Sequence, residues 1–117
     1  MSKTPLGRLP RDAIRMLELP RPSRDILEGY GALVDLTGTV SDAMDELGIV
    51  GVVPAYVLPP VAPGKRIVGP ALTVRNIQRS AQIHKAAQDK TNTQGESEAH
   101  NLAEAGDVLV IEGVMGC

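Results

Sequence analysis

The residues whose types and spacing are best suited to chemistry come last, where Glu112 follows the apolar run at 108–111. A carboxylate directly after a buried strand is either paired with a cation or functional, and the pattern leaves both alternatives open. The glycines that follow allow close backbone approach, so successive N–H groups there form a candidate nest for a carboxylate or phosphate. We therefore take Glu112 as the candidate catalytic residue and the following loop as the candidate substrate-binding segment: Gly113, Val114, Met115 and Gly116.

The other reactive side chains are isolated from one another in the sequence. His84 and His100 have no nearby histidine or cysteine partner, so we interpret them as solvated or hydrogen-bonded helix residues. Cys117 has no histidine beside it and is interpreted as an inert thiol. The glycine loop lacks the lysine of a phosphate-binding P-loop and does not match a dinucleotide fingerprint. The sequence therefore predicts no metal ligand set within this chain.

The remaining carboxylates are interpreted as structural. Asp42 is expected to complete a capping pair with Thr39 at the start of a helix. Glu96, Glu98 and Glu104 bracket a later helix and are expected to face solvent.

Composition indicates an aliphatic protein with little surface to bury. Among 117 residues there is no Phe or Trp, and Tyr30 and Tyr56 are the aromatic side chains, so the core must be aliphatic. A chain of this length buries about two-thirds of its unfolded surface, and we expect it to need a partner surface. The net charge of −2, from 12 basic and 14 acidic residues, gives no reason to predict nucleic-acid binding.

Targeting signals are not evident in the sequence. No stretch approaches the roughly 20 apolar residues of a membrane span, and no apolar segment typical of a secretory signal follows Met1. A single cysteine cannot form an internal disulfide, which favours a reducing, cytoplasmic location and no membrane partner.

Two regions position these residues: an N-terminal arm at 1–22 and a domain at 23–117. The four prolines of the arm predict an extended segment with one or two helical turns, which either wraps a neighbouring subunit or frays. A helix is predicted from Ser23 as N-cap to about Val34. A second helix is predicted to begin at Thr39 and to stop at Gly48.

The second half of the chain predicts alternating strands and helices. A strand is expected over 66–75, and because Pro70 lies inside it, it must be an edge strand, begin late or carry a bulge. Residues 77–95 indicate a helix and then a mobile loop, and Ser97 is expected to cap another helix that ends at Gly106. The run DVLVIEGV is typical of a buried central strand. Loops at strand carboxyl ends build ligand sites in α/β folds.

Three blocks together resemble the RraA-like, or 4-hydroxy-4-methyl-2-oxoglutarate aldolase, family. They are TGTVSDAMDELGI at 37–49, PGKRIVGPALTVR at 63–75 and AGDVLVIEG at 105–113, and the resemblance covers about residues 23–116. It implies an α/β fold, the RraA-like swivelling β/β/α domain, incomplete in this chain. It also implies a homo-oligomer, trimer or hexamer. The segment at 77–96 is longer and more polar than the family's usual connection.

The resemblance further implies a lyase, an aldolase or decarboxylase that acts on a 4-hydroxy-2-oxo dicarboxylic acid, gives pyruvate and depends on Mg²⁺ or Mn²⁺. In the family an Arg-Asp pair binds the pyruvyl carboxylate and holds the metal through water, and this pair lies downstream of the third block. We therefore expect no metal to be held by this chain alone. The chemistry would be completed by a segment absent here. A second chain that carries the rest of the domain is one way to supply it.

Two alternatives stay open at this point. The first is a non-catalytic regulatory or binding protein, as is the regulator of ribonuclease E within the same family. The second is a different reaction on the same scaffold, with this chain as one half of a cleaved two-chain protein, since fold does not fix function.

Overall fold

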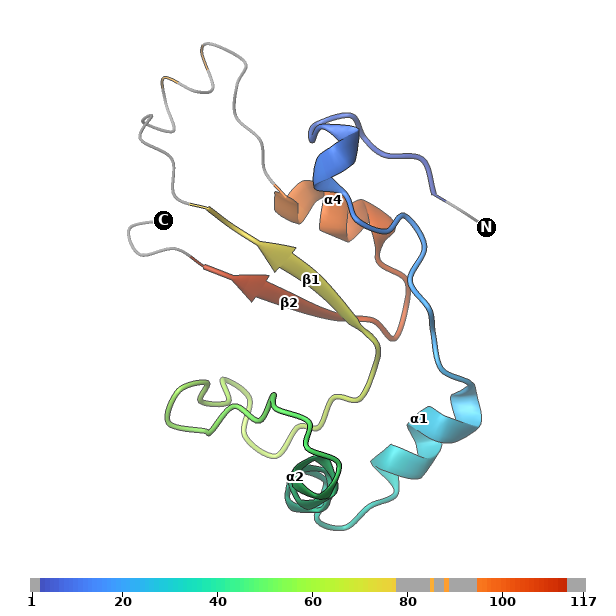
Figure 1. The fold of residues 1–117 in the computed structure, drawn as a ribbon, viewed down its shortest axis with the longest axis vertical. Helices are drawn as coiled ribbons and strands as arrows, with labels where there is room; N and C mark the ends of the chain where they lie inside the picture. The colour runs from blue at the N-terminus through green and yellow to red at the C-terminus, as the bar shows by residue number, and fades with distance from the viewer. Residues whose placement is uncertain (1–2, 78–84, 86–87, 89–94, 114–117) are drawn as a thin grey trace. The chain divides into compact units, whose positions relative to one another are not determined.

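The computed structural model describes residues 3–77, 85, 88 and 95–113. They form two compact units, which are coloured along the chain in Figure 1. The first, here called the sheet unit, contains residues 1–21 and 69–117, and the second, the helical unit, contains residues 22–68. Most of the predicted helix and loop at 77–95 lies outside the described residues, as does the end of the glycine loop.

The sheet unit is a parallel two-stranded sheet with a helical crossover. Strands β1 (Ala71–Arg75) and β2 (Val108–Glu112) lie side by side in Figure 1 and run in the same direction. The register pairs Ala71 with Val108 and Arg75 with Glu112. Helix α4 (Gly95–Leu102) precedes β2 in the chain and packs on β1. Parallel strands need such a long crossover, because a hairpin turn can join only antiparallel ones.

β1 begins late, at the residue after Pro70, which confirms one of the three options predicted for this strand. Proline has no N–H to donate to a ladder, but its carbonyl still accepts a bond from the N–H of Val108 at 2.9 Å. Just before it, Gly69 lies so close to Gly106 that a Cβ at Gly69 would be 2.0 Å from the Gly106 carbonyl oxygen. The glycine is therefore required for the two segments to enter the sheet together.

The core of the sheet unit is small and entirely aliphatic, as the composition predicts. Among the described residues, the buried hydrophobic side chains are Ile14, Leu72, Ala99 and Leu102. Partly buried side chains surround them: Leu9, Leu17, Leu19, Val74, Ala103 and Leu109. The core thus joins the N-terminal arm, β1 and α4.

The prediction that β2 is a buried central strand is wrong for the described part of the chain. Its side chains Val110 and Ile111 are 49% and 44% exposed. An apolar run is fully buried only when layers cover both faces of the sheet. Of the described elements, α4 packs on β1, and β2 has β1 as its one strand neighbour.

The N-terminal arm packs against its own sheet unit, so the expectation of a frayed end is wrong for residues 3–21. It contains a single short 3-10 helix, η1 (Arg11–Ala13), within an otherwise extended segment, as predicted. Directly after η1, Ile14 is only 8% exposed. The Lys3 ammonium donates to the carbonyls of Asn101 and Ala103, at 2.9 and 2.5 Å. These carbonyls lie at the carboxyl end of α4, where a cation is favourable.

The helical unit contains α1 (Arg24–Gly31) and α2 (Leu36–Glu46). Ser23 is at the N-cap position of α1 as predicted, although its side chain makes no capping bond. The predicted Thr39 cap of the second helix is wrong, because α2 begins at Leu36 with Asp35 as N-cap. The predicted stop is confirmed, since Gly48 follows α2 with a φ of +67°.

None of the helices in the described part of the chain is long and apolar enough to cross a membrane.

Candidate ligand site at the carboxyl edge of the sheet

The parallel pairing brings a basic and an acidic side chain to the same edge of the sheet. Arg75 ends β1 and Glu112 ends β2, directly opposite in the register. Arg75 Nε lies 3.4 Å from Glu112 Oε2, and the side chains are 84% and 63% exposed. An ion pair this exposed contributes little to stability. The Arg75 guanidinium can therefore release Glu112 and bind the carboxylate of a ligand in its place at little cost.

A second polar pair involves the residue that follows Arg75 in the chain. Asn76, the residue after β1, donates from Nδ2 to Glu96 Oε1 at 2.7 Å. This hydrogen bond, followed by one from the backbone N–H of Glu96 itself, lowers the pKa of Glu96 below its ordinary value. Glu96 is partly buried in the first turn of α4, so the expectation that it faces solvent is only partly met. The edge thus holds a fixed, ionised carboxylate beside an amide group.

Of the sequence-predicted site residues, Glu112 and Gly113 lie in the described part of the chain. A Cβ placed on Gly113 would meet no atom within 4 Å, so the space beside this backbone is open. The rest of the predicted substrate loop, Val114, Met115 and Gly116, lies outside the described residues.

Sequence reasoning missed Arg75, Asn76 and Glu96. For the first two a signal was present: they end and follow a predicted strand, where parallel topology gathers functional side chains. A carboxylate before a glycine marks the end of β2, at Glu112 and Gly113, but β1 ends without this pattern. Glu96 has no such local signal, because its place follows from the packing of α4 on β1.

Glu98 corrects another prediction, since it is buried rather than solvent-facing. It is 2% exposed, and its carboxylate accepts the backbone N–H of Leu6 at 3.0 Å and of Arg8 at 3.3 Å. The sequence places Glu98 in a polar, charged helix, but a distant segment supplies the donors that make its burial tolerable. Glu98 therefore anchors the N-terminal arm. Glu104, in contrast, is exposed as predicted.

The isolated reactive groups are consistent with a structural interpretation where they are described. His100 is exposed, and its Nδ1 lies 2.7 Å from the carbonyl oxygen of Glu96, so the prediction of a hydrogen-bonded helix histidine is confirmed. His84 and Cys117 lie outside the described residues. Within residues 3–77 and 95–113, no three His, Cys, Asp or Glu side chains come together as a metal site.

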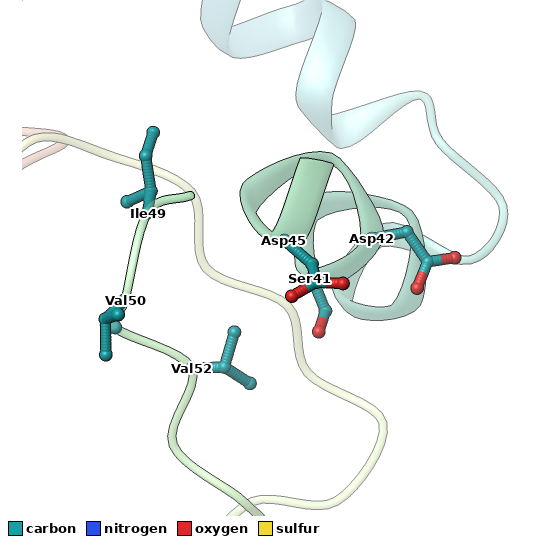
Figure 2. Close-up of a pocket in the computed structure, with 7 residues that line it drawn as sticks. Ser41, Asp42, Asp45, Ile49, Val50 and Val52 are labelled. Carbon is teal, nitrogen blue, oxygen red and sulfur yellow. The ribbon is translucent and has the colours of Figure 1, made fainter. Parts of the chain in front are cut away.

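A hollow lies in the helical unit. Figure 2 shows Ser41, Asp42 and Asp45 on α2, with the apolar residues Ile49, Val50 and Val52 of the following segment on the other side. Its volume is about 400 Å³. Asp42 therefore lines a hollow from inside α2, and the predicted capping role is wrong. Two acidic side chains beside an apolar segment do not by themselves define a ligand.

Comparison with known proteins adds no relative. No family model matches the chain, and no curated protein or solved structure is significantly similar to it.

Proposed function

We propose that this chain contributes the substrate-binding edge of a divalent-metal-dependent lyase, one that cleaves a 4-hydroxy-2-oxo dicarboxylic acid to pyruvate. One observation carries the proposal. The ends of two parallel strands set Arg75 beside Glu112, and Gly113 follows directly, with open space where a Cβ would stand. A cation for the carboxylate and an acidic group for proton transfer are what the cleavage of a small oxo acid needs. The three sequence blocks that resemble the RraA-like family support the same chemistry.

In the proposed complex, Arg75 holds the carboxylate next to the oxo group. A guanidinium binds a carboxylate through two parallel hydrogen bonds, which fixes the orientation of the acid. This carboxylate replaces Glu112 at the guanidinium. Released from its partner, Glu112 is then placed to accept a proton, directly or through one water.

The bond changes of the proposed cleavage balance without a redox partner. The 4-hydroxyl loses its proton to the base, the C3–C4 bond breaks, and the electron pair forms the enolate of pyruvate. The C4 fragment leaves as a carbonyl compound, and the enolate takes a proton at C3. The space for a Cβ at Gly113 is open, so the backbone there leaves room for the enolate beside the strand ends.

The residues present fit a divalent cation only in part. Mg²⁺ is commonly bound by one or two carboxylates together with substrate oxygens and water. Glu112 and Glu96 are hard oxygen donors at the edge, but they do not form a three-residue cluster with any other described side chain. When bound, the ion would supply charge stabilisation to the enolate.

A second function, binding of an oxo acid without chemistry, is favoured by a different observation. Both carboxylates at the edge already have partners, Glu112 with Arg75 and Glu96 with Asn76. A carboxylate that already pairs with a neighbouring side chain is less available as a base, so this arrangement also suits a site that binds the acid without reacting with it. This function corresponds to a regulatory or binding protein.

We further propose that the chain acts as a homo-oligomer. Residues 49–63 contain no charged side chain, and every one of them is exposed. Val50 and Val61 are fully exposed, and Tyr56 is 88% exposed. Exposed apolar patches larger than a few hundred Å² are rare on monomers and mark interfaces. Light scattering across a concentration series should give a mass above that of one chain, and a single-chain mass at every concentration would refute this.

The test of the proposed function compares Arg75→Gln with the matched variant Arg8→Gln. Arg8 is an exposed arginine of the N-terminal arm. Oxo-acid binding is measured by calorimetry with and without Mn²⁺, and pyruvate release is measured in parallel. We expect Arg75→Gln to weaken binding about 10-fold or more, because a charge-assisted contact is lost, and Arg8→Gln to change nothing. Binding without pyruvate release would favour the second function, and no loss in Arg75→Gln would remove the site.

A further inference from the structure

Strand β1 has a second edge, which is turned away from β2. In a parallel pair the residues of a strand alternate, and both backbone groups of every second residue point at the neighbouring strand. The carbonyl of Pro70 accepts the N–H of Val108 at 2.9 Å. By the same alternation, Leu72 and Val74 point their backbone groups at β2. The N–H and C=O groups that point the other way, here called the free edge of β1, belong to Ala71, Thr73 and Arg75.

No hydrogen bond within the described part of the chain engages the free edge. The sheet there has two strands, and the backbone bonds outside it include none from Ala71, Thr73 or Arg75. A groove of about 840 Å³ lies between β1, the N-terminal arm and α4. Every residue of β1 lines it, although their side chains alternate between two faces, so the groove runs along the edge of the strand. Unpaired N–H and C=O groups in a row are a template for another strand.

The helical unit contains a segment with the composition of a strand and no strand partner. Residues 49–53, with the sequence IVGVV, belong to no helix, strand or turn. Apart from Gly51 they are all β-branched, and β-branched residues are enriched in strands. Their side chains are at least 52% exposed, and that of Val50 is fully exposed. Among the described residues, the one backbone bond of this segment runs from the N–H of Ile49 to the carbonyl of Met44.

The segment fits the groove in polarity and in shape. Where α4 and the arm approach β1, the groove wall is aliphatic, at Ala99, Leu102 and Ile14. A strand added to β1 lies about 4.8 Å away and continues the alternation of its faces. Residues 49–53 carry aliphatic side chains at both alternate sets of positions, so either set can reach this wall. They bring no charge, and the carboxylate of Glu98 at the wall already accepts backbone N–H groups of the arm.

We propose that residues 49–53 of one copy of this chain add as a third strand to the free edge of β1 in a second copy. The inference rests on the proposed homo-oligomer and names its contact, and it is independent of the proposed lyase activity. The edge and the segment are different parts of the chain, so the contact is head-to-tail and each copy offers both halves of it. Contacts of this kind close into rings when the rotation between copies allows it.

Proline at position 73 tests the edge, because it removes an N–H that does not face β2 and so spares the existing ladder. The mass of the full-length chain is measured by light scattering over a concentration series. We expect Thr73→Pro to raise the concentration needed for association at least about 10-fold, since the added strand loses a hydrogen bond. Thr73→Val keeps the N–H and should associate as the unmodified chain does. Amide spectra of each variant report whether it folds.

A pair of prolines tests the segment. In Val52→Pro combined with Val53→Pro, one of the two lost N–H groups faces β1 in any register, because neighbouring residues of a strand point to opposite edges. This double variant should have the mass of one chain at concentrations where the unmodified chain associates. The control is Val61→Pro, at a fully exposed valine of the same uncharged region but outside the segment. It should leave the mass unchanged.

Mixing the two variants decides whether the contact joins different copies. Thr73→Pro keeps an intact segment, and the double variant keeps an intact edge. At a concentration where each alone is a single chain, their equimolar mixture should form a two-chain complex. A mixture that stays as single chains, or a folded Thr73→Pro variant with the mass of the unmodified oligomer, would overturn the strand contact and leave the homo-oligomer standing. A single-chain mass of the unmodified protein at every concentration would overturn both, and the pyruvate assay bears on neither.

Discussion

Arg21 holds the carboxylate of Asp107 through two parallel hydrogen bonds. Nε lies 2.9 Å from Oδ1 and Nη2 lies 2.6 Å from Oδ2. The Asp107 side chain is 1% exposed, and its Oδ2 also accepts the backbone N–H of Glu104 at 2.8 Å. One carboxylate therefore ties the end of the N-terminal arm to the turn that leads into β2.

The first prediction concerns the pH dependence of this pair. The hydrogen bond from Arg21 keeps the pKa of Asp107 below its ordinary value, which is about 3.9 in an unfolded chain. A lowered pKa in the folded state stabilises the fold above the unfolded pKa, and this contribution is lost as the pH falls through the folded one. Asp107→Asn should therefore lower the free energy of unfolding by about 1–3 kcal/mol at pH 7.

The difference between Asp107→Asn and the unmodified chain should shrink from about pH 4 downward, as measured by urea denaturation at several pH values. Glu104→Gln is the control, because Glu104 is 47% exposed and lies 3.5 Å from Arg21. Its effect should be close to zero. A difference for Asp107→Asn that is the same at every pH would contradict the assignment.

A second prediction concerns the anchor of the arm at Glu98. Glu98→Gln keeps the size of the side chain but turns one acceptor into a donor that faces a backbone N–H. We expect hydrogen exchange at the amides of Leu6 and Arg8 to rise about 10-fold, because a buried donor is left unsatisfied. Asp12→Asn, at an exposed residue of the same arm, should leave both rates unchanged. Unchanged exchange in Glu98→Gln would show that the carboxylate does not hold the arm.

The third prediction compares two glycines. Gly69→Ala places a Cβ 2.0 Å from the Gly106 carbonyl, so the backbone must shift, and we expect a loss of at least about 1–3 kcal/mol. Gly29→Ala, in α1, meets nothing within 4 Å and should stabilise by about 0.5–1 kcal/mol. Thermal melting of both variants measures the contrast. Similar melting temperatures for the two would mean that β1 and β2 do not enter the sheet as described.

A fourth prediction concerns Arg66 in the helical unit. Its guanidinium donates to the carbonyls of Gly31, Leu33 and Val34, at 3.2, 2.6 and 2.5 Å. The last carbonyls of a helix have no partner within it, and these bonds satisfy the segment that follows α1. Arg66→Lys cannot donate in the same forked geometry, so amide exchange in the last turn of α1 should accelerate. Lys65→Arg is the control, and equal exchange in both variants would count against this role.

The fifth prediction separates two roles at the sheet edge. If Glu112 accepts a proton, Glu112→Gln should lower turnover at least about 100-fold, while stability changes little because the pair with Arg75 is exposed. Gly113→Val fills the open space beside the backbone and should reduce both oxo-acid binding and turnover. Pyruvate release and urea denaturation are measured on the same preparations. A Gly113→Val variant with unchanged turnover and KM would show that the loop is only a connection.

Local signals in the sequence were sufficient for several features. Pro70 has no N–H to donate, which determines where β1 begins, and Gly48 adopts the positive φ that ends α2. Glu112 at the end of an apolar run correctly marks the end of a strand. Each of these follows from the backbone chemistry of one residue and its immediate neighbours. For the same reason, two helix starts were misplaced: Thr39 and Ser97 are good caps but lie inside α2 and α4.

The tertiary structure alone decided which distant groups meet. Whether Glu98 is exposed depends on whether Leu6 and Arg8, some 90 residues away, bring their N–H groups to it. The pairing of Arg75 with Glu112 depends on strand register, and a shift by one residue would turn one of them to the other face. Contacts between residues far apart in sequence carry no periodic signal, because they are selected by packing. The sequence therefore determined the strand ends and turns, and the fold determined the charge pairs that make an edge into a candidate site.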